Sequence, residues 1–215
     1  MSHYNVNKSK IVKKNMNFNS HSEDCGISKQ DQRKDQILDA ASACFVESGF
    51  HNAGMAAIAK RAEMSPGHIY HYFANKSDII ASIVEREFVA REEKFGTLFD
   101  VDGEHLIENL LSKVNEGVCH KTDPFQSMLS REIFAETQRN PDIAAIVQEY
   151  EQRSRERFID NIETKLGVKN AAAKVECIFA LFSGLAMRVP SDPPMDREAV
   201  VEVMKSAIKF LLSDK

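Results

Sequence analysis

The segment from residue 54 to residue 73 carries side chains that suit a contact with DNA. His68 and His71 have ring nitrogens that can donate to N7 or O6 of guanine in the major groove. Tyr70 and Tyr72 place hydroxyl donors on rigid stems, which suits phosphate oxygens. Because phosphates position a protein and base edges specify the sequence, the segment offers both kinds of contact.

The pattern around these side chains predicts a helix-turn-helix. One helix is expected over 54–61, a polar turn over 62–64, and a second helix that Ser65 caps and Pro66 opens. Such a pair lays its second helix in the major groove. Lys76, at the start of the next helix, is expected to place its ammonium and a helix N-terminal N–H against a phosphate. The predicted DNA-binding residues are Gly54, Met55, Ser65, Pro66, Gly67, His68, Tyr70, His71, Tyr72 and Lys76.

Two alternatives remain for these side chains at this point. Tyr70 can instead pack on the preceding helices. His68 and His71 lie three residues apart, as a pair of metal ligands can, but no third ligand is nearby in the sequence. We therefore predict no metal and no cofactor.

Apolar residues at helical spacing predict helices on both sides of this segment. The face from Ile37 to Phe45 predicts a preceding helix, which Gly49 is placed to end in a left-handed conformation. Further helices are expected near 76–96, 103–119, 124–138, 141–166, 170–189 and 196–213. No window alternates apolar and polar residues as a strand does. The sequence predicts an all-α fold, with a three-helix DNA-binding head and a larger C-terminal helical domain.

Composition and charge limit the classes of partner. The 215 residues are 43% hydrophobic and carry a net charge of −4. The longest apolar runs are far below the roughly 20 residues of a membrane span, so no membrane partner is expected. No apolar segment of a secretory signal follows the N-terminal lysines, which favours a cytoplasmic location. Residues 1–34 contain seven Lys and Arg against three Asp and Glu, and we interpret residues 1–28 as a disordered basic arm.

The four cysteines are scattered and never reach a CxxC spacing, so reduced thiols are expected. Cys44 and Cys177 fall on apolar helix faces and are predicted to pack there. A thiol-sensing role through Cys25 or Cys119 is an alternative function.

The last two predicted helices have unusually broad apolar faces. Such faces need one partner inside the subunit and one outside, which favours a two-fold four-helix interface between two copies of the chain. The predicted interface residues are Phe179, Phe182, Leu185, Met204, Ile208 and Leu211. The alternative is that both helices are central in a monomer.

The head resembles the N-terminal domain of TetR-family transcriptional regulators. The resemblance rests on the run RKDQILDAASACFVESGF and then on MAAIAKRAEMSPGHIYHYFANKSDII. It covers residues 31–92, with the helix-turn-helix at 54–73. Two positions depart from the family pattern, because Gly54 stands where the family usually has Thr or Ser and Tyr72 stands where His is frequent.

The resemblance implies a ligand-responsive repressor that binds a palindromic operator as a homodimer. It also implies that residues 93–215 bind a small-molecule effector whose occupation moves the long helix after the head. Thirteen Phe, eight Met and no Trp suit a lipophilic effector. The candidate pocket residues are Phe95, Phe99, Phe125, Met128, Phe134 and Phe182, although an ordinary core would use the same residues.

Two other classes of function compete with this interpretation. An enzyme is not expected, because the sequence has no GxSxG, HExxH, P-loop or GxGxxG motif. A helical adaptor that uses the same head to bind a protein is the second rival. Binding of genomic DNA fragments would separate a regulator from an adaptor.

Overall fold

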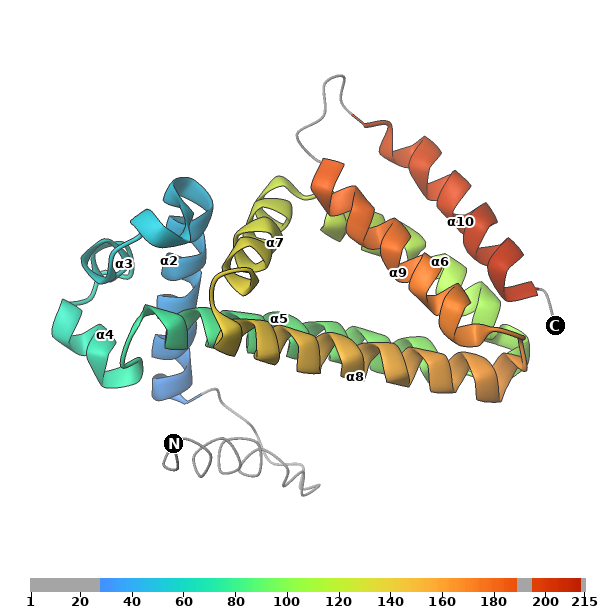
Figure 1. Ribbon diagram of the computed structural model, residues 1–215, viewed down its shortest axis with the longest axis horizontal. Coiled ribbons are helices and arrows are strands. Elements are labelled where there is room, and N and C mark those ends of the chain that lie inside the picture. The colour runs from blue at the N-terminus through green and yellow to red at the C-terminus, as the bar shows by residue number, and fades with distance from the viewer. Residues whose placement is uncertain (1–27, 189–194, 214–215) are drawn as a thin grey trace. The chain divides into compact units, whose positions relative to one another are not determined.

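A computed structural model describes residues 28–188 and 195–213, and these residues form α-helices and no strand (Figure 1). The helices are α2 (Lys29–Asn52), α3 (Met55–Arg61), α4 (Pro66–Tyr72), α5 (Lys76–Phe99), α6 (Gly103–Lys121), α7 (Pro124–Thr137), α8 (Pro141–Leu166), α9 (Ala171–Arg188) and α10 (Arg197–Ser213). The all-α prediction is confirmed. The predicted arm and Cys25 lie outside the described residues, except for Ser28.

Side-chain caps explain why most helices begin where the sequence predicted. Asn75, Asp102, Asp123 and Asn140 each accept a hydrogen bond from a backbone N–H in the first turn of α5, α6, α7 and α8. A side-chain oxygen at this position satisfies a donor that has no partner within the helix. The long helix α5 runs three residues beyond the predicted end, to Phe99.

The head consists of α2, α3, α4 and the start of α5 around one apolar cluster. Phe45, Ile58, Ile69 and Ile79 are at most 1% exposed at its centre. Leu129 of α7 belongs to the same cluster, together with Ile143 of α8. The head core is therefore continuous with the first part of the body.

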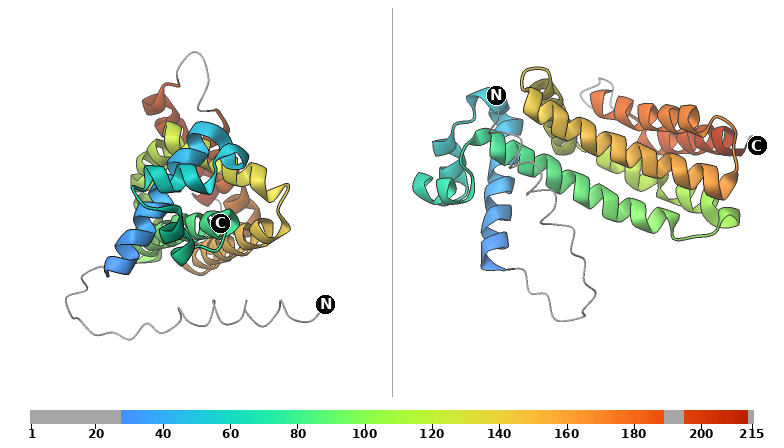
Figure 2. Two further views of the ribbon diagram at one scale, coloured as in Figure 1. Left: turned by 90° about the vertical axis from the view of Figure 1, so that its left-hand side faces the viewer. Right: turned by 60° about the horizontal axis from the view of Figure 1, so that its bottom comes forward.

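The remaining body helices share a second apolar cluster. Phe158 of α8 lies at its aromatic centre, with ring centroids 5.2, 4.8 and 5.3 Å from those of Phe95, Phe99 and Phe179. Figures 1 and 2 show α6 beside α9 and α10, and α6 contacts both. No helix in the described part of the chain is long and apolar enough to cross a membrane.

Gly49 interrupts α2 and determines how the chain enters α3. Its φ of 78° is positive, as the sequence predicted, but its ψ of 156° lies far from the value of about 47° in the left-handed helical region. This combination is almost restricted to glycine. Phe50–Asn52 therefore forms a separate turn after the break.

Replacing Gly49 with Ala should destabilise the protein by about 1–3 kcal/mol, because a Cβ is strained at this backbone conformation. The space itself is not the cause, since the atom nearest to an added Cβ, Glu132 Oε2, would be 3.6 Å away. Urea unfolding of the full chain measures the change. Gly67→Ala is the matched control, because a Cβ there meets nothing within 4 Å and its stability should stay level or rise. Equal effects of the two substitutions would contradict the account.

Candidate DNA-binding surface

The turn between α3 and α4 has the geometry of a tight helix-turn-helix. The N–H of Met64 donates to the carbonyl of Ala59 over 2.9 Å, and Glu63 adopts a positive φ of 53°. Ser65 then caps α4, because its hydroxyl accepts a hydrogen bond from the N–H of His68 over 3.2 Å. Pro66 occupies the first turn of the helix, where no backbone N–H is needed.

The short helix α4 divides its faces between the head core and the outside. Ile69 is fully buried and Phe73, just after the helix, is 6% exposed. Tyr70 is 53% exposed, and His68 and His71 are also exposed. Tyr70 is therefore available for an external contact.

Tyr72 is less accessible than the other aromatic residues of α4. Its ring contacts the rings of His68 and His71, with centroids 5.5 and 5.2 Å away. It is half-buried, and it also packs against the head core. Tyr72 therefore contacts both histidine rings and the head core.

At the start of α3, only backbone groups are available to a phosphate, because the N-cap residue has no side chain. Gly54 is the N-cap with an extended conformation, and no side chain caps this helix. A Cβ at Gly54 would meet nothing within 4 Å, so sterics do not require glycine here. Met55 is half-buried and packs against the head core.

The ammonium of Lys76 holds the end of α2. It donates to the carbonyl of Phe50 over 2.5 Å and to that of His51 over 3.2 Å, and it lies 4.4 Å from the centroid of the Phe50 ring. Burial lowers the pKa of Lys76, and the nearby charge of Glu136 partly opposes this effect. Two of the three ammonium hydrogens are thus used within the protein, and the phosphate contact stays a prediction.

Ion pairs occupy two of the guanidinium groups in and next to the head. Arg61 forms a two-pronged pair with Glu47, with N–O distances of 2.5 and 2.6 Å. Glu47 raises the pKa of Arg61, and Arg61 lowers the pKa of Glu47 by hydrogen bonding. Arg86 pairs with Asp39 over 2.8 Å. These pairs reduce the positive charge that the head can offer to DNA.

The predicted effector residues do not gather at one place. Phe99 is buried in the body core, where Phe95 and Phe182 pack around the same cluster. On α7, Phe125 and Phe134 are 39% and 58% exposed, and Met128 is half-buried. Phe182 fills the space above Gly117, where a Cβ would approach its ring to 2.6 Å.

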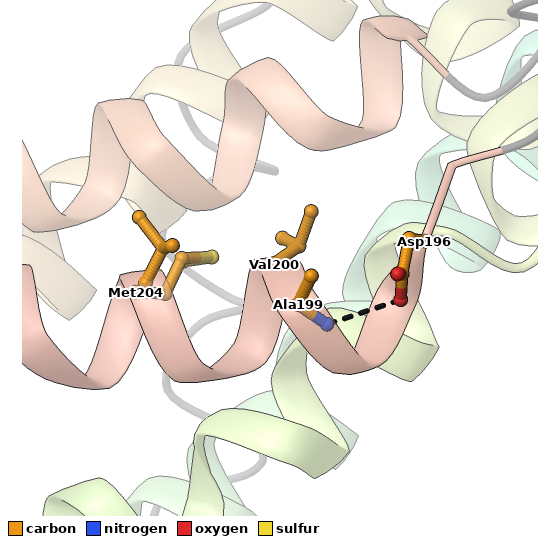
Figure 3. A pocket seen from close by; sticks show the side chains of 5 residues that line it. Asp196, Ala199, Val200 and Met204 are labelled. Atoms are coloured by element: carbon orange, nitrogen blue, oxygen red, sulfur yellow. Dashed lines mark hydrogen bonds between the residues drawn. The ribbon is translucent and has the colours of Figure 1, made fainter.

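An open hollow of about 310 Å³ lies at the start of α10 (Figure 3). Its lining is formed by Asp196, Ala199, Val200, Val203 and Met204. None of the predicted effector residues is among them. Within the described residues, no cluster of three potential metal ligands is found.

The predicted dimer residues lie more deeply than the sequence suggested. Met204 and Ile208 are 5% and 3% exposed and belong to the chain's own core, while the other predicted residues are half-buried. The large exposed apolar side chains of the same two helices are Leu181, Met187, Val203 and Phe210. The spacing of Val203 and Phe210, seven residues apart on one helix face, was the signal that could have found them.

Comparison with known proteins finds a family model that matches the head. The sequence profile described as "Bacterial regulatory proteins, tetR family" matches residues 37–83, which include α3, α4 and Lys76. Residues 37–83 are thus similar to the DNA-binding part of this family. The predicted resemblance is confirmed.

Relatives extend this similarity beyond the head. The HTH-type transcriptional regulator UidR of Escherichia coli (strain K12) is 36% identical over 117 residues, which cover 53% of this chain and 56% of UidR. The chain thus spans about half the length of this relative.

Solved structures share the fold over most of the chain. GusR of Salmonella enterica superposes with a TM-score of 0.70 at 23% identity, over 87% of this chain and 98% of GusR. FadR of Bacillus subtilis in complex with stearoyl-CoA superposes with a TM-score of 0.68 at 20% identity, over 84% of this chain and 98% of FadR.

Replacing Lys76 with Met should lower the free energy of unfolding by about 1 kcal/mol. The substitution keeps an apolar stem against Phe50 but removes the ammonium that holds two carbonyls. Urea unfolding without DNA measures the change, with exposed Lys60→Met as the control. Unchanged stability of the Lys76 variant would show that the ammonium does not hold the end of α2 in solution.

Proposed function

We propose that the protein is a transcriptional regulator that reads DNA with α4. The observation that carries the proposal is the exposed set of Tyr70, His68 and His71 on a helix whose other face is locked into the head. The family match over residues 37–83 supports the same assignment. The protein would act in the cytoplasm, where its DNA is.

The residues of α4 suit two kinds of contact with DNA, one to base edges and one to phosphates. His68 and His71 can donate to guanine N7 or O6, while the Tyr70 hydroxyl suits a phosphate oxygen. Gly67 leaves open space where a Cβ would stand, so the backbone of α4 can approach a groove closely. Gly54 can offer only backbone groups to a phosphate.

We also propose that the regulator is a homodimer that binds a palindromic operator. α9 and α10 run side by side (Figure 2), and they carry exposed Leu181, Met187, Val203 and Phe210. Ala180 and Gly184 are four residues apart on α9, which permits close approach of a second helix. A two-fold pair would place two reading helices about 34–36 Å apart, or a small multiple of this distance.

We further propose that the protein is a repressor and that a lipophilic effector releases it from DNA. Phe95 of α5 and Phe182 of α9 support it, because both are half-buried apolar residues that pack around the same body cluster. The complex of the structurally similar FadR with stearoyl-CoA points to the same class of ligand. A ligand releases DNA only if it binds the other conformation better, typically by about 1–3 kcal/mol.

Sequencing of genomic fragments retained by the full chain tests the DNA-binding proposal. We expect enrichment of a palindromic motif. In a gel shift with labelled DNA that carries this motif, an excess of the unlabelled site should remove the shifted band. A lack of enrichment would instead favour the adaptor.

Tyr70→Phe should weaken operator binding by about tenfold, because it removes a hydroxyl that donates to a charged oxygen. Thermal stability of the free protein should not change, since Tyr70 is 53% exposed. Fluorescence anisotropy with the enriched site measures the affinity. Equal affinities of the variant and the parent chain would remove Tyr70 from the proposed contact.

Phe210→Glu should convert the dimer to a monomer. The Phe210 side chain is 79% exposed in the single chain and would be buried in the proposed interface, where a charge is unfavourable. Sedimentation equilibrium should give twice the chain mass of 24.2 kDa for the parent chain and the single mass for the variant. Val89→Glu is the control, since Val89 is 47% exposed on α5. A Phe210 variant that stays dimeric would place the interface elsewhere.

A further inference from the structure

Charged side chains separate the apolar cluster of the head from that of the body along two helices. On α5, Ile83 belongs to the head cluster and Phe95 packs against the body cluster. Arg91 stands between them, four residues before Phe95 and therefore on the same face of the helix. On α8, Glu151 lies seven residues before Phe158 of the body cluster, again on the same face. The facing sides of α5 and α8 thus change from apolar to charged and back to apolar.

The last residue of α6 adds a second cation to this layer. Lys121 continues the buried face of α6, because it lies three residues after Val118, which is fully buried. Burial and the charge of Arg91 lower the pKa of the half-buried Lys121. Glu151 and Glu87 act on this pKa in the opposite direction. Within the described residues, the ammonium forms neither a hydrogen bond nor an ion pair, although these charges lie around it.

Arg91 uses only part of its guanidinium within the protein. Its Nη1 donates to Oε1 of Glu151 over 2.9 Å. Its Nε is buried and has no hydrogen-bond partner in the described part of the chain. The guanidinium carbon lies 5.8 Å from the centroid of the Phe88 ring, which is stacked on Tyr150. Because a buried N–H without a partner is unfavourable, an acceptor from outside the chain would be bound well at this place.

The layer therefore brings two cations together with incomplete pairing. Burial of a charge is costly unless the charge is paired and hydrogen-bonded. A carboxylate from outside the chain would pair with the guanidinium of Arg91 and the ammonium of Lys121 at once, and such charge-assisted hydrogen bonds are strong. The alternative is that Glu87, which is half-buried one turn before Arg91, serves as the partner of Lys121.

The two aromatic residues that support a lipophilic effector lie close to these two cations in the fold. Phe95 is one helical turn after Arg91 on α5. The ring of Phe182 fills the space at Gly117, which is one helical turn before Lys121 on α6. A ligand with an acidic group at the two cations could thus extend its apolar part toward both aromatic rings.

We propose that Arg91 and Lys121 together bind the carboxylate of the effector, which is therefore a lipophilic acid and not a neutral lipid. The carboxylate accepts from the ammonium of Lys121 and from the Nε–H of Arg91, which has no other partner among the described residues. Its apolar part lies toward Phe95 and Phe182. The inference rests on the proposed effector-responsive function, and it adds the charge of the ligand and the residues that recognise this charge.

Isothermal titration calorimetry of the full chain tests the preference for an acid. Two acids, decanoate and phenylbutyrate, are compared with their uncharged amides, which have the same apolar part. We expect at least one acid to bind about tenfold more tightly than its amide, because only the acid forms charge-assisted hydrogen bonds with both cations. If neither acid binds more tightly than its amide, the inference is overturned.

Variants of the two cations test the assigned residues with the same pairs of ligands. Lys121→Met should weaken binding of the acid about tenfold and leave binding of the amide unchanged. Arg91→Gln should act in the same direction, and Lys121→Met alone decides if the Arg91 variant does not fold. Lys113→Met replaces an exposed lysine of the same helix and is the matched control, with unchanged affinities expected. Equal affinities of Lys121→Met and the parent chain for the acid would overturn the assignment.

Urea unfolding without ligand distinguishes a binding role of Lys121 from a structural one. Lys121→Met should leave the free energy of unfolding unchanged or raise it, because the half-buried ammonium has no direct partner among the described residues. A clear loss of stability would mean that Lys121 is paired within the protein, for example with Glu87, and would overturn the inference. Lys113→Met again serves as the control.

The outcomes separate this inference from the proposed function. If no operator is enriched, the proposed function fails, and calorimetry still decides whether Arg91 and Lys121 bind an acid. If an acid binds through Lys121 but does not change the affinity for the enriched operator, the binding site stands and the acid is not an effector.

Discussion

The backbone of Phe50 is held on both sides by side chains of two other helices, and this arrangement connects the end of α2 to α5 and α7. Lys76 donates to its carbonyl from the start of α5, and Glu132 accepts from its N–H on α7. Gly49 makes the arrangement available, because its backbone conformation breaks α2 and redirects the next peptide group. Hydrogen bonds to charged groups are stronger than neutral ones, so a single residue can join three helices.

This joint explains how a small head can present a well-defined reading surface. The helix α4 is only seven residues long and would not be stable alone. Ile69 and Phe73 bury its inner face, and Ser65 satisfies its first turn. Its outer face then displays Tyr70 and the two histidines at positions fixed by the head. Leu129 of α7 also belongs to the apolar cluster of the head, so the head packs directly against the body.

The sequence predicted the elements better than their contacts. Asn140 and Pro141 marked the start of α8, and Gly167 marked its end, because caps act locally and have recognisable residue types. The destination of the Lys76 ammonium was not predictable, since it depends on how the chain turns after Gly49. The same holds for Met204 and Ile208, because a broad apolar stripe does not show which side faces its own core. Glu132 gave no local signal, as its partner lies 82 residues away.

The measurement that tests the central claim most directly is methylation protection of the enriched operator by dimethyl sulfate. If α4 reads the major groove in a dimer, guanine N7 should be protected in two clusters about one helical turn apart, or a small multiple of it. Tyr70→Phe should weaken both clusters together. Protection of adenine N3 in the minor groove, or a single cluster of protected guanines, would contradict the account.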